Sequence, residues 1–263
     1  MRRLGRRRVD LIRAEWDQRS KKRARSKTHS DLNIRRLEID FTTRNLKGRI
    51  SRTSRVLDVG CGDGLSTREY APNAIGIDYS ATMARAARRR GLQTLVADVG
   101  HLPFVDGVFD AVVSMRTLIN VPTSRLQMNA LDEMIRVTRR RGMIVLAETS
   151  RQGLCALNRL RQQSGLKMIA PPWFNRPLDE HRLSVHISSR RKLTSVALRR
   201  YNLYFLITRI LHPLFVSPNE PDPGSTINRI AADIAMTMPD PSFGSDQQMS
   251  MTSQMICLAL SRQ

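Results

Sequence analysis

The sequence predicts an α/β protein built on a doubly wound, mostly parallel sheet with helices on both faces. Over residues 55–148, short runs that are apolar at nearly every position alternate with segments of helical periodicity. Strands of this kind are buried on both faces, which is typical of a parallel sheet covered by helices. The composition agrees, because 41% hydrophobic and 25% charged residues in a chain of 263 are ordinary for a globular protein.

The first 50 residues are expected to form a basic helical segment. Apolar side chains fall at helical spacing in two groups, which are Leu11, Ile12 and Trp16 and then Leu37, Phe41 and Leu46. Residues 8–47 are therefore expected to contain one or two helices.

The segment 51–150 contains the five predicted strands in chain order. They are residues 55–59, 74–78, 94–98, 109–115 and 142–148. A helix is expected to begin near Leu65, after the first strand. Ser80 is a suitable N-cap for the next helix, which Gly91 ends, and Thr123 or Ser124 caps the helix before the fifth strand.

The remaining segment, 151–263, is predicted to be mainly helical, with helices near 177–188, 203–212 and 225–236 and a last strand at 255–260. We expect that strand to return to the edge of the sheet, and Pro213 to end the second of the three helices. An apolar stripe on that helix either packs against the sheet or touches a membrane surface. Its members are Leu203, Leu206, Ile207, Ile210 and Leu211.

The net charge of +21 is concentrated at the two ends of the chain. Residues 56–150 hold 11 basic and 10 acidic side chains, whereas residues 1–55 hold 19 and 6. Two interpretations stay open. The basic ends form a solvated surface, or they bind phosphate groups on nucleic acid, an anionic lipid or a nucleotide-linked substrate.

The sequence also indicates a cytoplasmic protein. No stretch approaches 18 consecutive apolar residues, so we expect no membrane-spanning helix, and the Arg-rich start does not lead into the apolar stretch of a secretory signal. The cysteines, Cys61, Cys155 and Cys257, are odd in number and far apart, which argues against a disulfide framework and against a structural zinc site.

A glycine-rich loop and two acids mark a candidate ligand site at one edge of the sheet. The first strand runs into Gly60-Cys61-Gly62, and glycine there lets a backbone approach a ligand closely. Asp78 and Asp98 end the next two strands, where a carboxylate can accept ribose hydroxyls or an adenine amino group. A dinucleotide-binding fingerprint would need Gly or Ala at position 65, where Leu65 stands.

These residues resemble the class I S-adenosylmethionine-dependent methyltransferases. The resemblance is carried by the run from Val56 to Gly64, by Gly76 to Ser80 with Met83, and by Ala97-Asp98 followed by Leu102-Pro103-Phe104 and Phe109-Asp110. One departure from the family is Arg140-Arg141-Gly142-Met143, before the fifth strand, where Lys-Pro-Gly-Gly is common.

The resemblance implies a Rossmann-like sheet of seven strands and S-adenosylmethionine as cofactor. It divides the chain into a basic helical segment over the cofactor (1–50), the cofactor-binding core (51–150), and acceptor-side helices with the last strands (151–263). It also implies the cofactor-binding residues, which are Asp58, Gly60, Cys61, Gly62, Asp78, Tyr79, Asp98, Val99 and Met115.

A weaker resemblance covers the flanking segments. Trp16-Asp17 with Thr28 to Asp31, Arg116 to Val121, and Leu157 to Arg161 are similar to bacterial methyltransferases associated with polysaccharide synthesis. It favours a small-molecule acceptor, anionic or sugar-derived. The alternative is an RNA methyltransferase that binds phosphates with its basic ends. A third hypothesis is a binding protein that has the fold but no catalytic activity.

A hydroxyl acceptor requires a base, and Glu148 at the end of the fifth strand is the leading candidate. Arg116 and Asn120 are expected to orient the acceptor, and Arg159 and Arg161 to pair with an acceptor phosphate or carboxylate. No pair of histidines has metal-ligand spacing, so no metal is expected. The other candidate bases are His29, Asp31, His101, His181 and His186.

Overall fold

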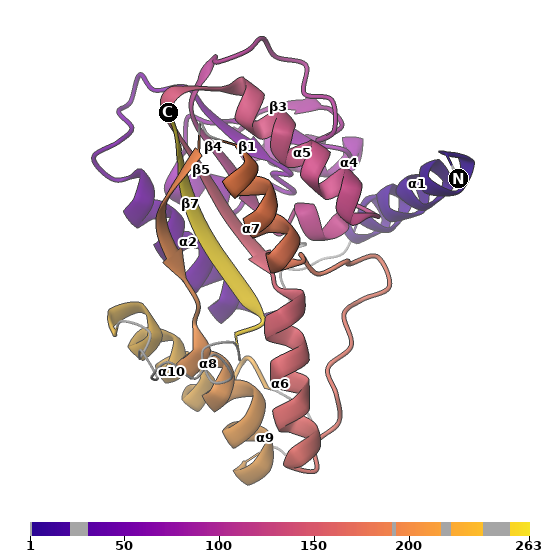
Figure 1. Ribbon diagram of the computed structural model, residues 1–263, viewed down its shortest axis with the longest axis vertical. Helices are drawn as coiled ribbons and strands as arrows, with labels where there is room; N and C mark the ends of the chain where they lie inside the picture. Colours follow the sequence, from indigo (N-terminus) through magenta and orange to yellow (C-terminus); the bar gives the residue numbers. More distant parts are fainter. Residues whose placement is uncertain (1, 22–30, 191–192, 217–221, 239–252) are drawn as a thin grey trace.

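The computed structural model describes residues 2–21, 31–190, 193–216, 222–238 and 253–263, and the side chains within this set from residue 7 onward. One seven-stranded sheet runs through it in the order β3-β2-β1-β4-β5-β7-β6 (Figure 1). The strands in this order are Gln93–Val96, Ile75–Asp78, Val56–Val59, Phe109–Met115, Thr138–Thr149, Met255–Arg262 and Leu193–Arg199. β1 to β5 run parallel to one another, and β7 is antiparallel to both β5 and β6.

Helices cover both faces of the sheet, as expected. They are α1 (Arg2–Arg19), α2 (Leu32–Leu46), α3 (Thr67–Tyr70), α4 (Ala81–Arg89), α5 (Ser124–Val137), α6 (Arg151–Gln163), α7 (Glu180–Ser189), α8 (Asn202–Leu206), α9 (His212–Phe215) and α10 (Thr226–Thr237). The predicted caps are confirmed, because the hydroxyls of Ser80 and Thr123 accept hydrogen bonds from the backbone at the starts of α4 and α5.

Alternation along each strand divides the core into two clusters. In β5, Val145 points to a cluster formed with α2, α8 and α10, whereas Ile144 and Leu146 point to a cluster formed with α5 and α7. Figure 1 shows α5 and α7 on one side of the sheet and α2 on the other. The carboxyl ends of the parallel strands therefore lie at one edge, between the two helical layers.

The last strand was expected at the sheet edge, and that expectation is wrong. β7 lies between β5 and β6, and its residues from Met255 to Leu260 are all buried. The edge at this end of the sheet is β6, and no strand was predicted over its residues. Every residue of β6 is half-buried or exposed, as expected for an edge strand. Its sequence therefore lacks the continuous apolar run that marks the buried strands.

The expectation that Pro213 ends the helix near 203–212 is also wrong. After α8 the chain makes a π-helical turn over Ile207–Leu211 (η2), and α9 begins at His212. The helical backbone continues through Leu211 and His212 into α9, which contains Pro213. The carbonyl of Arg209, four residues before Pro213, accepts a hydrogen bond from the Arg161 side chain in place of the N–H that proline lacks. Of the apolar stripe, Ile210 is buried, Leu203, Leu206 and Ile207 are half-buried, and Leu211 is exposed, so the stripe mainly packs inward. None of the described helices is long and apolar enough to cross a membrane.

Helix α6 was likewise not predicted. Gly153 lies in its first turn, and glycine there weakens a helical pattern in the sequence. The structure shows why glycine is present, since a Cβ at this position would lie 1.8 Å from the carbonyl oxygen of Ser253. Close approach of α6 to the start of β7 places α6 beside the functional edge of the sheet.

Candidate cofactor and acceptor site

A cleft with a volume of about 290 Å³ lies at the carboxyl ends of β1, β2 and β4. Every residue expected to bind the cofactor contributes to its lining. They are Asp58, Gly60, Cys61, Gly62, Asp78, Tyr79, Asp98, Val99 and Met115. The structure thus brings together side chains from four loops, which is the position where doubly wound sheets bind ligands.

The glycine loop has a left-handed backbone at three positions, with φ of 75° at Gly60, 54° at Gly62 and 75° at Gly64. Two of these glycines also make room for the protein itself. A Cβ on Gly60 would lie 2.1 Å from the Thr117 hydroxyl oxygen, and one on Gly64 would lie 2.9 Å from the Cβ of Ala87. The expected reason for glycine, close approach to a ligand, therefore accounts for only part of the requirement.

Asp78 ties the glycine loop to the end of β2. Its Oδ2 accepts a hydrogen bond from the backbone N–H of Gly62 at 2.9 Å, and its Oδ1 accepts one from Ser80 at 2.8 Å. A carboxylate has about four lone-pair positions, so two remain for a ligand in the cleft. Burial raises the pKa of Asp78 to about 6, and the two backbone donors oppose that shift.

Asp58 lies on β1 at the base of the cleft and is 3% exposed. The Thr67 hydroxyl donates to its Oδ2. Its Oδ1 is buried without a hydrogen-bond partner among the described residues. Burial raises the pKa of Asp58 to about 6, and the Thr67 hydrogen bond opposes the shift. An unpartnered buried carboxylate oxygen is costly, and a cationic group in the cleft would relieve the cost.

The other end of the cleft is more open. Asp98 is exposed, and its Oδ1 accepts a hydrogen bond from the N–H of Gly100 at 2.8 Å. Tyr79 is half-buried, and the guanidinium of Arg13 lies 5.3 Å from its ring centre. This end combines a carboxylate and an aromatic ring, which suits a nucleoside base.

Helix α1 forms one wall of the cleft. Asp17 Oδ1 accepts hydrogen bonds from the hydroxyls of Ser80 and Thr82, at 2.6 and 2.7 Å. The indole N–H of Trp16 donates to Asn120 at 3.3 Å, and the Trp16 ring makes an edge contact with Phe174. Through these contacts the basic N-terminal helix is attached to both the cofactor-side and the C-terminal segments.

Glu148 lines neither this cleft nor the second cavity described below, so its expected role as a base is not supported by its position. It is 1% exposed. Its carboxylate accepts hydrogen bonds from the Ser114 hydroxyl and from the backbone N–H groups of Thr117, Leu118 and Ile119. Burial raises the pKa of Glu148 to about 7, against these donors. The side chain holds the turn after β4, where a short 3-10 helix (η1) spans Leu118–Asn120.

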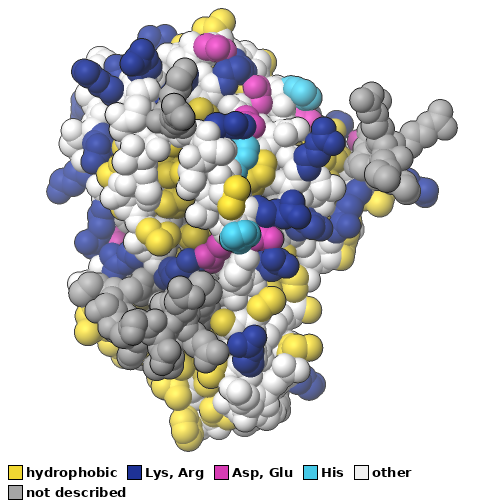
Figure 2. Space-filling view, in the orientation of Figure 1, with side chains coloured by type: hydrophobic (Ala, Val, Ile, Leu, Met, Phe, Trp, Pro, Cys, Tyr) yellow, Lys and Arg dark blue, Asp and Glu magenta, His cyan; other side chains and the backbone are white. Residues whose placement is uncertain are grey.

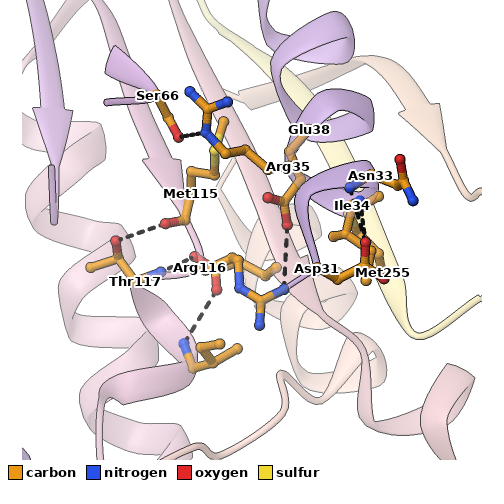
Figure 3. A network of polar contacts seen from close by, with 12 residues as sticks. Asp31, Asn33, Ile34, Arg35, Glu38, Ser66, Met115, Arg116, Thr117 and Met255 are labelled. Atoms are coloured by element: carbon orange, nitrogen blue, oxygen red, sulfur yellow. Dashed lines mark hydrogen bonds and ion pairs between the residues drawn. The ribbon is translucent and has the colours of Figure 1, made fainter. Parts of the chain in front are cut away.

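Arg116 and Asn120, the two residues expected to orient the acceptor, both line the cleft. Arg116 has a φ of 54°, unusual for a residue other than glycine, at the end of β4. Its Nη1 lies 3.7 Å from Oε1 of Glu38 on α2. Figure 3 shows the Glu38 carboxylate facing the Arg116 guanidinium across the space between α2 and β4.

The other candidate bases are spread over the molecule. His29 lies outside the described residues. His101 is exposed at the rim of the cleft, and His181 is exposed on α7. His186 lies 2.9 Å from Asp132 in a surface pair. Asp31 caps α2 and pairs with Arg209. The described residues contain no cluster of potential metal ligands.

A second cavity, of about 420 Å³, adjoins the cleft and was not anticipated. Arg116, Pro172 and Asn175 line both spaces. The rest of its wall comes from α2, α6, α8 and η2, from the ends of β5 and β7, from the loop 167–177 after α6 and from Pro223, and includes Glu38, Arg161 and Arg209. No local motif in the sequence marks these residues, because they converge only when the helices pack. Arg159, the other arginine considered for an acceptor, is exposed on α6 and does not line it.

Comparison with known proteins identifies the domain. The family model described as "Methyltransferase domain" matches residues 57–146. This region is a class I methyltransferase domain. The match begins on β1 and ends on β5, and therefore covers the glycine loop, Asp78 and Asp98. Two geranyl diphosphate methyltransferases of similar fold, each 14% identical to this chain, have structures with S-adenosyl-L-homocysteine or SAM bound.

Individual relatives support this assignment. Over 101 residues this chain is 39% identical to a demethylmenaquinone methyltransferase of Renibacterium salmoninarum, covering 36% of this chain and 41% of that protein. Over 132 residues it is 30% identical to "Probable tRNA methyltransferase 9B" of Bos taurus, covering 50% of this chain and 28% of that protein. This chain spans about half the length, or less, of these curated relatives.

The fold extends beyond the matched region. The geranyl diphosphate C-methyltransferase of Streptomyces coelicolor superposes with a TM-score of 0.61 at 14% identity, over 97% of this chain and 98% of that chain. At that identity the superposition describes the fold alone. It covers the antiparallel β7 and β6 as well as the methyltransferase domain.

Proposed function

We propose that the chain transfers a methyl group from S-adenosylmethionine to a small-molecule acceptor, preferentially a hydroxyl of a sugar-derived compound. The observation that carries the proposal is the pair of adjoining spaces: a cleft lined by the cofactor motif and a second cavity that shares Arg116 with it. Both volumes are of the size typical of small-molecule sites, roughly 300–1,000 Å³.

The residues of the cleft fit the cofactor in three places. Asp78 retains acceptor positions for the two ribose hydroxyls. The unpartnered Oδ1 of Asp58 suits the ammonium group at the methionine end. Asp98 and Val99 line the cleft, and we assign them to the adenine edge of the cofactor.

The cofactor supplies an activated methyl group, so the protein's contribution is to position the acceptor and remove its proton. The acceptor oxygen forms a bond to the methyl carbon as the carbon–sulfur bond breaks. In place of Glu148 we propose Glu38 as the group that takes the hydroxyl proton, since it lines the second cavity and faces Arg116. Asn175 lines both spaces and has a buried Oδ1 without a partner in the described chain, which suits an acceptor hydroxyl.

An RNA acceptor is the second candidate. The net charge of +21 and the relatives named as tRNA methyltransferases favour it. Figure 2 shows the Lys and Arg side chains of one face in several separate groups, with acidic and hydrophobic side chains between them. The second cavity, whose volume is about 420 Å³, favours the small molecule.

Labelling with S-adenosylmethionine that carries a tritiated methyl group distinguishes the two acceptors. Purified protein is incubated with a fractionated bacterial extract at low and high salt. Label in the polar glycan or nucleotide-sugar fraction, with little dependence on salt, is the expected result. Label in the nuclease-sensitive fraction that falls steeply with salt would instead establish an RNA acceptor.

A further inference from the structure

The second cavity has a basic lining. Four cationic side chains, Arg116, Arg161, Lys167 and Arg209, face two acidic ones, Asp31 and Glu38. Among the described residues the cations of the lining exceed its acids by two, so this part of the lining has a net positive charge. An acceptor that carries a negative charge would complement it.

The individual contacts show which cation is available. Arg161 is 1% exposed and has a structural role, since its Nε donates to the Lys167 carbonyl and its Nη1 to the Arg209 carbonyl. Arg209 is 5% exposed, and its Nη2 donates to Asp31. Its Nη1 has no hydrogen-bond partner among the described residues. A buried guanidinium nitrogen without an acceptor is an exception that calls for a ligand.

The backbone around Arg209 is also unusual. Arg209 lies in the π-helical turn η2, and such turns are rare and occur frequently at functional sites. Its guanidinium lies 5.9 Å and 5.8 Å from the ring centres of Tyr204 and Phe205, and the Tyr204 hydroxyl donates to Asp31. The rings and Asp31 fix the guanidinium in the wall of the cavity before any ligand arrives.

We infer that the second cavity binds an anionic group of the acceptor, a carboxylate or a phosphate monoester, with Arg209 Nη1 as its buried donor and Lys167 at its exposed side. This inference rests on the proposed function, because it names the chemical class of the acceptor for that same site. A guanidinium nitrogen and an ammonium group are the usual donors to both anions. The acceptor would therefore be a sugar acid or a sugar phosphate.

The test measures binding of three probes to the protein saturated with S-adenosylhomocysteine. Glucuronate carries the carboxylate, glucose 6-phosphate carries the phosphate, and glucose is the neutral control. At least one anionic sugar is expected to bind at least about tenfold more tightly than glucose. The stronger of the two identifies the anion. Equal binding of all three, or binding of glucose alone, would overturn the inference.

Two variants locate the site. Arg209→Lys keeps a charge beside Asp31 but removes Nη1, and Lys167→Ala alters an exposed residue that leaves the core unchanged. Each is expected to weaken binding of the anionic probe by about tenfold or more, whereas Arg159→Ala, an exposed control on α6, leaves that binding unchanged. Should Arg209→Lys fail to fold, Lys167→Ala decides alone. Anion binding that is indifferent to the variants that fold would refute the assignment.

Binding of S-adenosylhomocysteine distinguishes failure of the proposed function from failure of this inference. If the wild-type protein does not bind S-adenosylhomocysteine, the proposed function itself fails. If it binds S-adenosylhomocysteine but no anionic probe, only the present inference fails.

Discussion

The carboxylate of Asp78 accepts a hydrogen bond from the backbone N–H of Gly62, with 2.9 Å between Oδ2 and the nitrogen. This bond joins the two parts of the cofactor motif, the loop after β1 and the end of β2. It fixes the loop while leaving acceptor positions on the carboxylate, so one residue both shapes the cleft and is available to a ligand.

Cofactor affinity is expected to depend on pH through Asp78. Its pKa of about 6 means that the carboxylate is mainly protonated at pH 5 and loses much of its capacity to accept hydrogen bonds. Calorimetry with S-adenosylhomocysteine should give binding about tenfold weaker at pH 5 than at pH 7. The variant Asp78→Asn should show a shallower pH profile, and an affinity constant across this range would contradict the assignment.

Without cofactor, the contribution of Asp78 to the free energy of unfolding should decrease as the pH rises, whereas cofactor affinity should increase. The folded-state pKa of Asp78, about 6, lies above its usual value of 3.8 because burial disfavours the charged form. The folded protein therefore holds this proton where the unfolded chain has lost it. The contribution of Asp78 to stability is fully present below pH 3.8 and is lost as the pH rises through about 6. Urea denaturation of wild type and Asp78→Asn over this range checks the sign.

Gly60→Ala is expected to lower the free energy of unfolding by about 2–4 kcal/mol, from backbone strain at φ 75° together with a clash against Thr117. Gly91→Ala is the matched control, because Gly91 has a φ of 85° but no atom within 4 Å of the added Cβ. Urea denaturation of both variants separates the two effects. Equal losses would mean that the contact with Thr117 costs nothing.

Glu148→Gln is expected to destabilise the protein by about 1–3 kcal/mol, because an amide group replaces one of two oxygens that accept hydrogen bonds from four donors. Thermal unfolding measures the loss. A variant of unchanged stability that had lost methyl transfer would restore Glu148 as the base and remove the positioning role assigned to it.

Glu38→Gln should reduce kcat by about 100-fold or more with little change in the affinity for S-adenosylhomocysteine, because the variant cannot take up the acceptor proton. Glu69→Gln is the control. Glu69 forms an ion pair with Arg35, a residue of the helix that carries Glu38, but Glu69 does not line the second cavity. Steady-state kinetics with the labelled product provide the measurement. Full activity in Glu38→Gln would exclude it as the base.

The parallel part of the fold was predictable because central strands such as β1 and β4 are buried on both faces, and because caps such as Ser80 and Thr123 mark the helix starts. The antiparallel end was not. β6 is half exposed and has a mixed pattern, and the place of β7 inside the sheet depends on its pairing with β5, which no local signal in the sequence encodes. The prediction that Pro213 ends a helix was wrong for a similar reason, because the π-helical turn before it depends on tertiary packing.

The same distinction applies to the residues of the site. Residues at or near the carboxyl ends of parallel strands, such as Asp58, Asp78 and Asp98, could be placed from the sequence, because these ends meet at one edge. Glu38 and Arg209 could not, since they lie on helical segments 171 positions apart and come together only through tertiary packing. Glu148 was predicted from its position at a strand end, but its carboxylate is buried beneath the turn that it holds.

The most direct measurement is calorimetric titration of S-adenosylhomocysteine into the wild-type protein, Asp78→Ala and the surface control Asp132→Ala. The wild type and Asp132→Ala should bind one equivalent with the same affinity. Asp78→Ala should bind more weakly by about 1.5–3 kcal/mol, because charge-assisted hydrogen bonds to the ribose are lost. No binding by the wild type, or equal affinity in all three proteins, would contradict the cofactor site on which the proposed function depends.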